Sequence, residues 1–274
     1  MEIARVLFAQ GDDIARWEAI SQAVNLRDAP IRVLLAPGEY QFLQVDLPQV
    51  APEELKTALR WQVKDQLAWP VESSTLDVIA CVEDPASHRR PPGFVVAAAN
   101  PILLKHMQRF RAHNARVTVI DIPEMAQRNL AQMLDEPGRA TALLSIGESG
   151  ALLTATRGSQ IFFTRRFDSP FEAISKSEEG RRAVFDRLVL ELQRSADVLE
   201  HQLSHLGVSK LWLAPFPHRD ELLSLLIDSL YLPVKAIELE SLFDFGAEGA
   251  PQDELVAAAL FLPLGLALRE RAVP

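Results

Sequence analysis

The residues with the clearest potential for chemistry lie in three short apolar runs between Thr141 and Arg166. Glycines mark the two turns between these runs, with Gly147 and Gly150 at the first turn. Glycine lets the backbone adopt a positive φ or approach a ligand closely, and backbone N–H groups in such turns can hold an anion. The pattern predicts two consecutive hairpins. Ser145, Gly147 and Gly150 form a candidate phosphate or anion site at the first turn.

Other reactive residue types do not converge on a catalytic set. Residues 147–150 contain a serine but lack the Gly-x-Ser-x-Gly frame of serine hydrolases. His201 and His205 could share a metal ion, but Gln202 stands where the zinc-protease pattern has glutamate. The single cysteine, Cys81, lies in an apolar run and is interpreted as a buried small residue. We therefore predict no catalytic residue and no metal ligand.

The composition argues against nucleic-acid binding. The 274 residues carry a formal net charge of −9, whereas nucleic-acid binding requires a basic face. The basic cluster at residues 88–90 adjoins two prolines and is interpreted as a solvated loop. Residues 255–268 form an apolar run too short for a membrane span. With one cysteine and no signal peptide, we expect a cytoplasmic protein.

Strand-like and helix-like patterns alternate along the whole chain, which is typical of α/β architecture. The strongest helix pattern has a proline at its first turn and an apolar stripe on one face (residues 53–67). Other helices are expected at residues 13–24, 101–113, 123–134, 181–205, 220–231 and 254–270. Strands are expected at residues 3–9, 31–36, 41–47, 76–82, 93–99, 116–120, 142–146, 151–156, 160–165, 210–214 and 234–239.

Several segments, in order, resemble the PilM family of proteins with an actin-like ATPase fold, and within it the MshI branch. The hairpin pattern resembles the family's second phosphate-binding hairpin. Residues 45–71 resemble its small inserted subdomain, with Leu-Pro, Glu-Leu and Trp-Gln landmarks. Residues 119–130, 191–195 and 264–269 carry further matches, so the resemblance covers most of the chain. The cytoplasmic part of the type II secretion protein GspL is similar too.

The resemblance implies an α/β, actin-like (ribonuclease H-like) fold of two lobes. The turn-forming residues 135–138 predict the boundary, with an N-terminal lobe at residues 1–137 and a C-terminal lobe at residues 138–274. A small inserted subdomain is expected at about residues 40–82. The family's first phosphate hairpin has no counterpart in this sequence, so either the protein lacks it or it lies upstream of residue 1.

Two further departures from the family's pattern concern the residues that contact a nucleotide. Ser145 stands where the family carries the aspartate that serves the nucleotide-bound metal. Ala214 and Pro215 stand where relatives that bind ATP carry a Gly-Gly turn, and proline fixes φ and adds bulk. We therefore expect no cofactor and no ATP hydrolysis, with at most an anion held at Ser145, Gly147 and Gly150. The alternative is a nucleotide-binding regulatory ATPase of the actin-like family.

Two tryptophans are candidate partner-binding residues. Trp61 falls off the apolar stripe of its helix, and Trp69 precedes Pro70 in a loop. Large aromatic residues away from a core stripe are common interface anchors, although both could instead pack within the small subdomain. The resemblance implies a cytoplasmic scaffold of type IV (MSHA-like) pilus assembly at the inner-membrane face. It would bind the cytoplasmic tail of a PilN-like membrane protein and connect it to the assembly ATPase.

Overall fold

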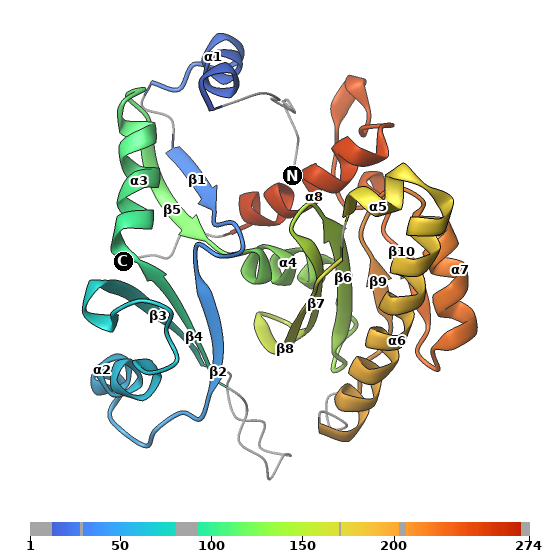
Figure 1. Cartoon of the computed structure of the whole chain (residues 1–274), viewed down its shortest axis with the longest axis horizontal. Helices are drawn as coiled ribbons and strands as arrows, with labels where there is room; N and C mark the ends of the chain where they lie inside the picture. The colour runs from blue at the N-terminus through green and yellow to red at the C-terminus, as the bar shows by residue number, and fades with distance from the viewer. Residues whose placement is uncertain (1–12, 28–29, 81–92, 170, 203–206, 270–274) are drawn as a thin grey trace. The chain divides into compact units, whose positions relative to one another are not determined.

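The computed structural model describes residues 13–27, 30–80, 93–169, 171–202 and 207–269 (Figure 1). Contacts group these residues into two compact units. One unit is Val24–Pro123, and the other is Glu124–Pro274 together with α1 (Asp13–Ala23). The predictions for residues 3–9, for Cys81, for residues 88–90 and for His205 lie outside the described residues.

The unit that begins at Glu124 is built on one five-stranded sheet with the order β10-β9-β6-β7-β8. The first three strands along the chain form an antiparallel meander, as the two glycine-marked turns predicted. The last two strands are parallel to β6, so the sheet has the strand order of a ribonuclease H-like domain. The strands are β6 (Thr141–Gly147), β7 (Gly150–Arg157), β8 (Gln160–Phe167), β9 (Leu211–Leu213) and β10 (Val234–Ala236).

Helices cover both faces of this sheet (Figure 1). Successive side chains of a strand point to opposite faces. Leu144 accordingly belongs to the core under α6 and α7, whereas its neighbour Leu143 belongs to the core under α4 and α8. Both leucines are fully buried, and β6 reads as a continuous apolar run because it is the central strand. The helices are α4 (Pro123–Ala131), α5 (Phe171–Lys176), α6 (Glu178–Gln202), α7 (Arg219–Ser229) and α8 (Glu254–Ala267).

The backbones of α4 and α8 approach each other at Gly265. A Cβ built on Gly265 would lie 2.1 Å from the carbonyl oxygen of Ala126. The Nδ2 of Asn129 donates to the Gly265 carbonyl at 2.9 Å. Helix α8 is the expected apolar helix, and no helix of the described residues is long and apolar enough to cross a membrane. Its apolar surface serves the core of this unit instead.

The division between the units falls earlier than predicted, at Pro123 rather than after Pro137. The predicted linker at residues 135–138 is anchored to the sheet. Asp135 accepts a hydrogen bond from the Gly158 N–H at 2.9 Å, and Glu136 pairs with Lys210. Residues 135–138 therefore form a tight connection within one unit rather than a linker between two, because α4 packs with the strands that follow it.

The unit Val24–Pro123 contains two small sheets. In one, β1 runs parallel to β5. In the other, β4 lies between β2 and β3 and is antiparallel to both. Helix α2 packs its fully buried Leu59 and Val63 onto the second sheet. The elements are β1 (Pro30–Leu34), β2 (Gln41–Val45), α2 (Pro52–Val63), β3 (Ser74–Ala80), β4 (Gly93–Ala99), α3 (Asn100–Arg111) and β5 (Arg116–Asp121).

The second sheet changes the extent of the predicted inserted subdomain. The predicted range of about 40–82 omits β4, yet β4 supplies the central strand, with Val95 and Ala97 fully buried. The sheet therefore extends to Ala99. Short 3-10 helices complete the description: η1 (Val71–Ser73), η2 (Gln132–Leu134), η4 (Leu239–Ser241) and η5 (Gly246–Glu248).

Asp135 and Glu136 should have opposite effects on the pH dependence of stability. Burial raises the pKa of the Asp135 carboxyl above its ordinary value of 3.8, although the Gly158 N–H opposes this rise. Its contribution to stability is therefore full below about pH 3.8 and lost as pH rises through the raised pKa. The hydrogen bond from Lys210 lowers the pKa of Glu136 from its ordinary value of 4.5. That contribution is present above about pH 4.5 and lost as pH falls through the lowered pKa.

The two carboxylates can be compared by replacing each with its amide. Urea unfolding between about pH 4 and pH 7 should show the wild type losing stability relative to Asp135→Asn as pH rises. Relative to Glu136→Gln, the wild type should gain stability over the same range. The same trend in both variants would contradict the assignment.

Candidate functional site

Ser145 faces inward and is bound by α4. Its side chain is buried, and its hydroxyl donates to Oε1 of Gln127 at 2.6 Å. The Nε2 of the fully buried Gln127 lies within hydrogen-bonding distance of three acceptors: the carbonyl oxygens of Leu143 (2.6 Å) and Leu152 (3.1 Å) and Oγ1 of Thr154 (3.0 Å). The polar atoms at this position are therefore satisfied within the protein.

The Ser145–Gln127 hydrogen bond has a chemical consequence. The serine hydroxyl has one proton to donate, and the amide oxygen of Gln127 receives it. An aspartate at the same position would direct a carboxylate at that amide oxygen in a buried place. Gln127 was not among the site residues predicted from the sequence. A polar residue next to Ala126 in an otherwise core-facing helix was the available signal, and its strand partners were not deducible from spacing.

The two glycines at the first turn have different roles. Gly147 and Gly150 are paired across the turn that joins β6 to β7. Gly150 has a φ of +91°, and a Cβ there would lie 2.7 Å from the Phe167 carbonyl oxygen. Gly147 has open space where a Cβ would stand. The close approach of β8 thus explains Gly150, whereas the fold alone does not require Gly147. The Ser145 side chain is engaged with α4, so of the three predicted anion-site residues only the backbones of Gly147 and Gly150 could contact an anion.

The segment after β9 contains Ala214 and Pro215, the two residues that depart from the Gly-Gly turn expected from the resemblance. Ala214 donates its N–H to the Leu144 carbonyl at 2.9 Å, and both Ala214 and Pro215 are buried. Ligands of α/β sheets bind at the carboxyl ends of the parallel strands. A cavity of about 190 Å³ does lie there, lined by residues that include Pro215, Arg219, Glu238, Glu240 and Glu254.

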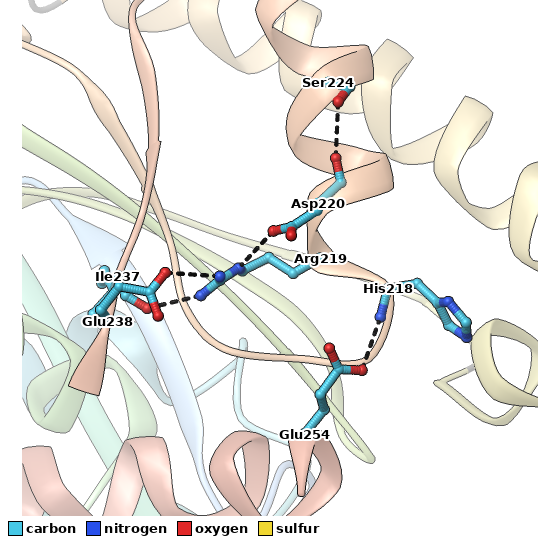
Figure 2. Close-up of polar contacts among 7 residues, drawn as sticks. All are labelled: His218, Arg219, Asp220, Ser224, Ile237, Glu238 and Glu254. Atoms are coloured by element: carbon cyan, nitrogen blue, oxygen red, sulfur yellow. Dashed lines mark hydrogen bonds and ion pairs between the residues drawn. The ribbon is translucent and has the colours of Figure 1, made fainter. Parts of the chain in front are cut away.

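The charges of this cavity do not favour a phosphate. Figure 2 shows Arg219, at the start of α7, reaching toward the end of β10. Its guanidinium donates to the Ile237 carbonyl at 2.8 Å and to Glu238 at 2.8 Å. Glu254 accepts the His218 backbone N–H at 3.3 Å. Three glutamates line the cavity, and the one arginine is already engaged by a carboxylate, so an anionic ligand would meet mainly negative charge.

Trp61 lies on the exposed face of α2. Its side chain is 66% exposed, whereas Leu59 and Val63 on the opposite face are fully buried. The Nζ of Lys64 lies 5.6 Å from the centre of the indole ring. The alternative in which Trp61 packs into the small subdomain is therefore wrong. An exposed indole beside an ammonium group can pack against an apolar partner and accept a carboxylate at its edge.

Trp69 is half-buried in the loop that follows α2. The side chain of Gln41 fixes this loop: its Oε1 accepts the Ala68 N–H at 2.7 Å, and its Nε2 donates to the Gln66 carbonyl at 3.2 Å. The Nε1 of Trp69 is buried and has no hydrogen-bond partner among the described residues. Trp69 thus combines partial packing with an unused donor.

The predicted histidine pair can be assessed only in part. His201 is exposed near the end of α6, and the position of its predicted companion is not described. In the described part of the chain, no cluster of three or more histidine, cysteine, aspartate or glutamate side chains is arranged to hold a metal ion.

Similarity to known proteins is detected in the three-dimensional structure rather than in the sequence. No protein-family model matches the chain, and no curated protein matches it significantly. A chain of the PilM-PilN type IV pilus biogenesis complex superposes with a TM-score of 0.68 at 21% identity, covering 88% of this chain and 80% of its own length. The cytoplasmic domain of EpsL, an inner membrane component of the type II secretion system of Vibrio cholerae, gives 0.47 at 13% identity, covering 93% and 81%. A protein of unknown function with an actin-like ATPase fold from Bacteroides thetaiotaomicron gives 0.44 at 8%, covering 76% and 68%.

The class of fold is thus defined. The chain is an α/β protein with a ribonuclease H-like sheet in one unit, and the predicted actin-like class is confirmed. In particular, its fold is that of the chain from the PilM-PilN complex, so the predicted PilM-like recognition is confirmed at the level of fold.

Removing the Ser145 hydroxyl should destabilise the protein. In Ser145→Ala, Oε1 of Gln127 loses its donor in a buried place, which costs about 1–3 kcal/mol of unfolding free energy. Ser149, exposed in the adjacent turn, offers the matched control, and Ser149→Ala should change stability by less than about 0.5 kcal/mol. Chemical denaturation of both variants measures the difference, and equal stabilities would show that the Ser145–Gln127 bond contributes little.

Proposed function

We propose that the protein is a scaffold of type IV pilus assembly that binds the cytoplasmic tail of a PilN-like inner-membrane protein and does not hydrolyse ATP. The likeness in fold to a chain of the PilM-PilN complex supports the assembly system. A fold alone does not fix a function. The observation that carries the proposal is therefore the exposed indole of Trp61 on a helix whose opposite face is core.

The surface of α2 and the following loop has the properties of a peptide-docking surface. Trp61 offers a large rigid aromatic, and such residues dominate binding energy at interfaces. Trp69 is half-buried in the adjoining loop, which Gln41 holds in place. A partner peptide would pack against Trp61 and against the exposed part of the Trp69 ring.

Two features support a protein that does not use nucleotide. Ser145, which stands where the family carries the metal-serving aspartate, donates its hydroxyl proton to the side chain of Gln127. The cavity after β9 presents three glutamates and an arginine already engaged with Glu238. Phosphate oxygens would gain no free cation in that cavity, and a nucleotide-bound metal would lack the aspartate that the family carries at position 145.

The remaining parts of the proposal rest on the same family resemblance. The scaffold would act in the cytoplasm at the inner-membrane face, held there by its partner, in a system of the MSHA type with MshI as the counterpart. Connection to the assembly ATPase would be a second role. The competing function, a nucleotide-binding regulatory ATPase, makes a different prediction for Mg-ATP.

Replacing Trp61 separates binding from folding. Trp61→Ala should weaken binding of the partner's cytoplasmic tail by about 2 kcal/mol or more, as at interface hot spots. It should change stability by less than about 0.5 kcal/mol because the side chain is exposed. Calorimetric titration and thermal unfolding of the same variant provide the two measurements. Tyr231→Ala, which removes a fully exposed aromatic side chain elsewhere on the chain, is the matched control. Unchanged affinity in folded Trp61→Ala would remove Trp61 from the site.

Mg-ATP should bind more weakly than about 1 mM, or less than roughly 4 kcal/mol, and no hydrolysis should be detected. The metal lacks its aspartate, and the cavity near Pro215 is acidic. Isothermal calorimetry and a phosphate-release assay test this. Micromolar affinity would favour the regulatory ATPase instead.

A further inference from the structure

A second surface, separate in sequence from the Trp61 site, combines a groove with an unpaired charge. The groove has a volume of about 350 Å³ and lies between the end of β8 and one side of α6. We call it the β8–α6 groove. Its strand side is residues 165–168, and its helix side includes Ala183, Arg187 and Glu191. These three helix residues are spaced by four and so form one row along α6.

The floor of the β8–α6 groove is apolar. Phe167, Val184 and Leu188 line it, and all three are buried members of the core beneath the sheet. The rim is open, since Ala183 and Arg187 are exposed. A side chain entering the groove would therefore meet apolar atoms at the bottom and charged groups at the edge.

Two of the three arginines that line the groove have carboxylate partners among the described residues, and the third does not. Arg165 pairs with Glu191 at 2.6 Å, and Arg166 pairs with Glu124 at 3.0 Å. Arg187 has neither a hydrogen bond nor an ion pair within the part of the chain that the structure describes. Asp168 is the one exposed carboxylate of the lining. On a chain of net charge −9, an exposed guanidinium above an apolar floor offers a selective place for a carboxylate.

The dimensions of the groove suit an extended peptide. From Ala183 to Glu191 the helix rises about 12 Å, at 1.5 Å per residue. About four residues of extended chain span that length. The other wall is β8, the outermost strand of the sheet order, so the groove runs beside a strand, as in known modes of peptide recognition.

We propose that the β8–α6 groove binds an extended segment of a protein partner that places apolar side chains on the floor and a carboxylate on Arg187. The guanidinium of arginine matches a carboxylate with two parallel hydrogen bonds. Nucleic acid does not fit these features, because it requires several free cations along a basic face. This site is additional to the proposed Trp61 surface and does not depend on it.

The first experiment identifies peptides that bind only when the groove is open. A random dodecapeptide library displayed on phage is panned against the full chain, with counter-selection against Ala183→Trp, in which the groove is filled. Enriched peptides are synthesised with a fluorophore, and their binding is measured by anisotropy. We expect enriched peptides to combine an aspartate or glutamate with apolar neighbours.

Matched variants then test the role of each charge. Arg187→Glu should weaken these peptides about tenfold or more, and changing the peptide's carboxylate to lysine should restore binding to that variant. Asp168→Asn should bind equally or more tightly, because a repelling carboxylate is removed. Arg182→Glu, on the same helix outside the groove lining and already paired with Glu178, should bind as the wild type does.

Several results would overturn the proposal. They are the absence of any peptide that prefers the wild type over Ala183→Trp, enriched peptides without acidic residues, or equal binding to the wild type and to folded Arg187→Glu. Circular dichroism establishes that each variant is folded. Trp61→Ala should bind the selected peptides normally, so the outcome is independent of the test of the Trp61 surface.

Discussion

The buried side chain of Gln127 joins the parts on which the larger unit depends. From α4 it contacts the carbonyl oxygens of Leu143 and Leu152, on two neighbouring strands, and it accepts the hydroxyl of Ser145. An amide in a fully apolar core would cost several kcal/mol if it were unpaired. Here each polar atom has a partner, so the amide instead fixes the position of α4 on the sheet. The position of α4 in turn determines the position of α8, because Gly265 of α8 allows the two backbones to approach closely and Asn129 of α4 donates to the Gly265 carbonyl.

Local patterns were sufficient for the elements but not for their grouping. The antiparallel meander was predictable because glycines and short apolar runs specify hairpins within a few residues. The α/β class was predictable because the alternation of patterns extends over the whole chain. The lobe boundary was not predictable from residues 135–138, since hydrogen bonding to Gly158 and pairing with Lys210 join residues distant in sequence. The place of β4 at the centre of its sheet likewise depends on partners on either side in space.

In the candidate sites too, local spacing predicted some features, whereas others depend on residues that are distant in sequence. Exposure of Trp61 followed from its spacing relative to Leu59 and Val63, because a helix has a fixed period. The inward direction of Ser145 was deducible in principle from strand alternation, but its partner Gln127 was not. The engagement of Arg219 with the end of β10 was also out of reach, because it depends on how the loop after β9 returns to the sheet.

The positions associated with nucleotide share one physical property, which is that their polar groups are satisfied by the protein itself. A site that needs a metal or phosphate holds groups that stay partly unsatisfied until the ligand arrives, and this lowers the stability of the empty state. Ser145 and Arg219 carry no such cost, since Gln127 and Glu238 occupy their hydrogen-bonding capacity. Among the exposed charged groups that line a groove, the guanidinium of Arg187 is one that has unused hydrogen-bonding capacity within the described part of the chain. An unpaired guanidinium at the surface costs little in the free protein because water solvates it, and it can gain free energy when a partner supplies a carboxylate.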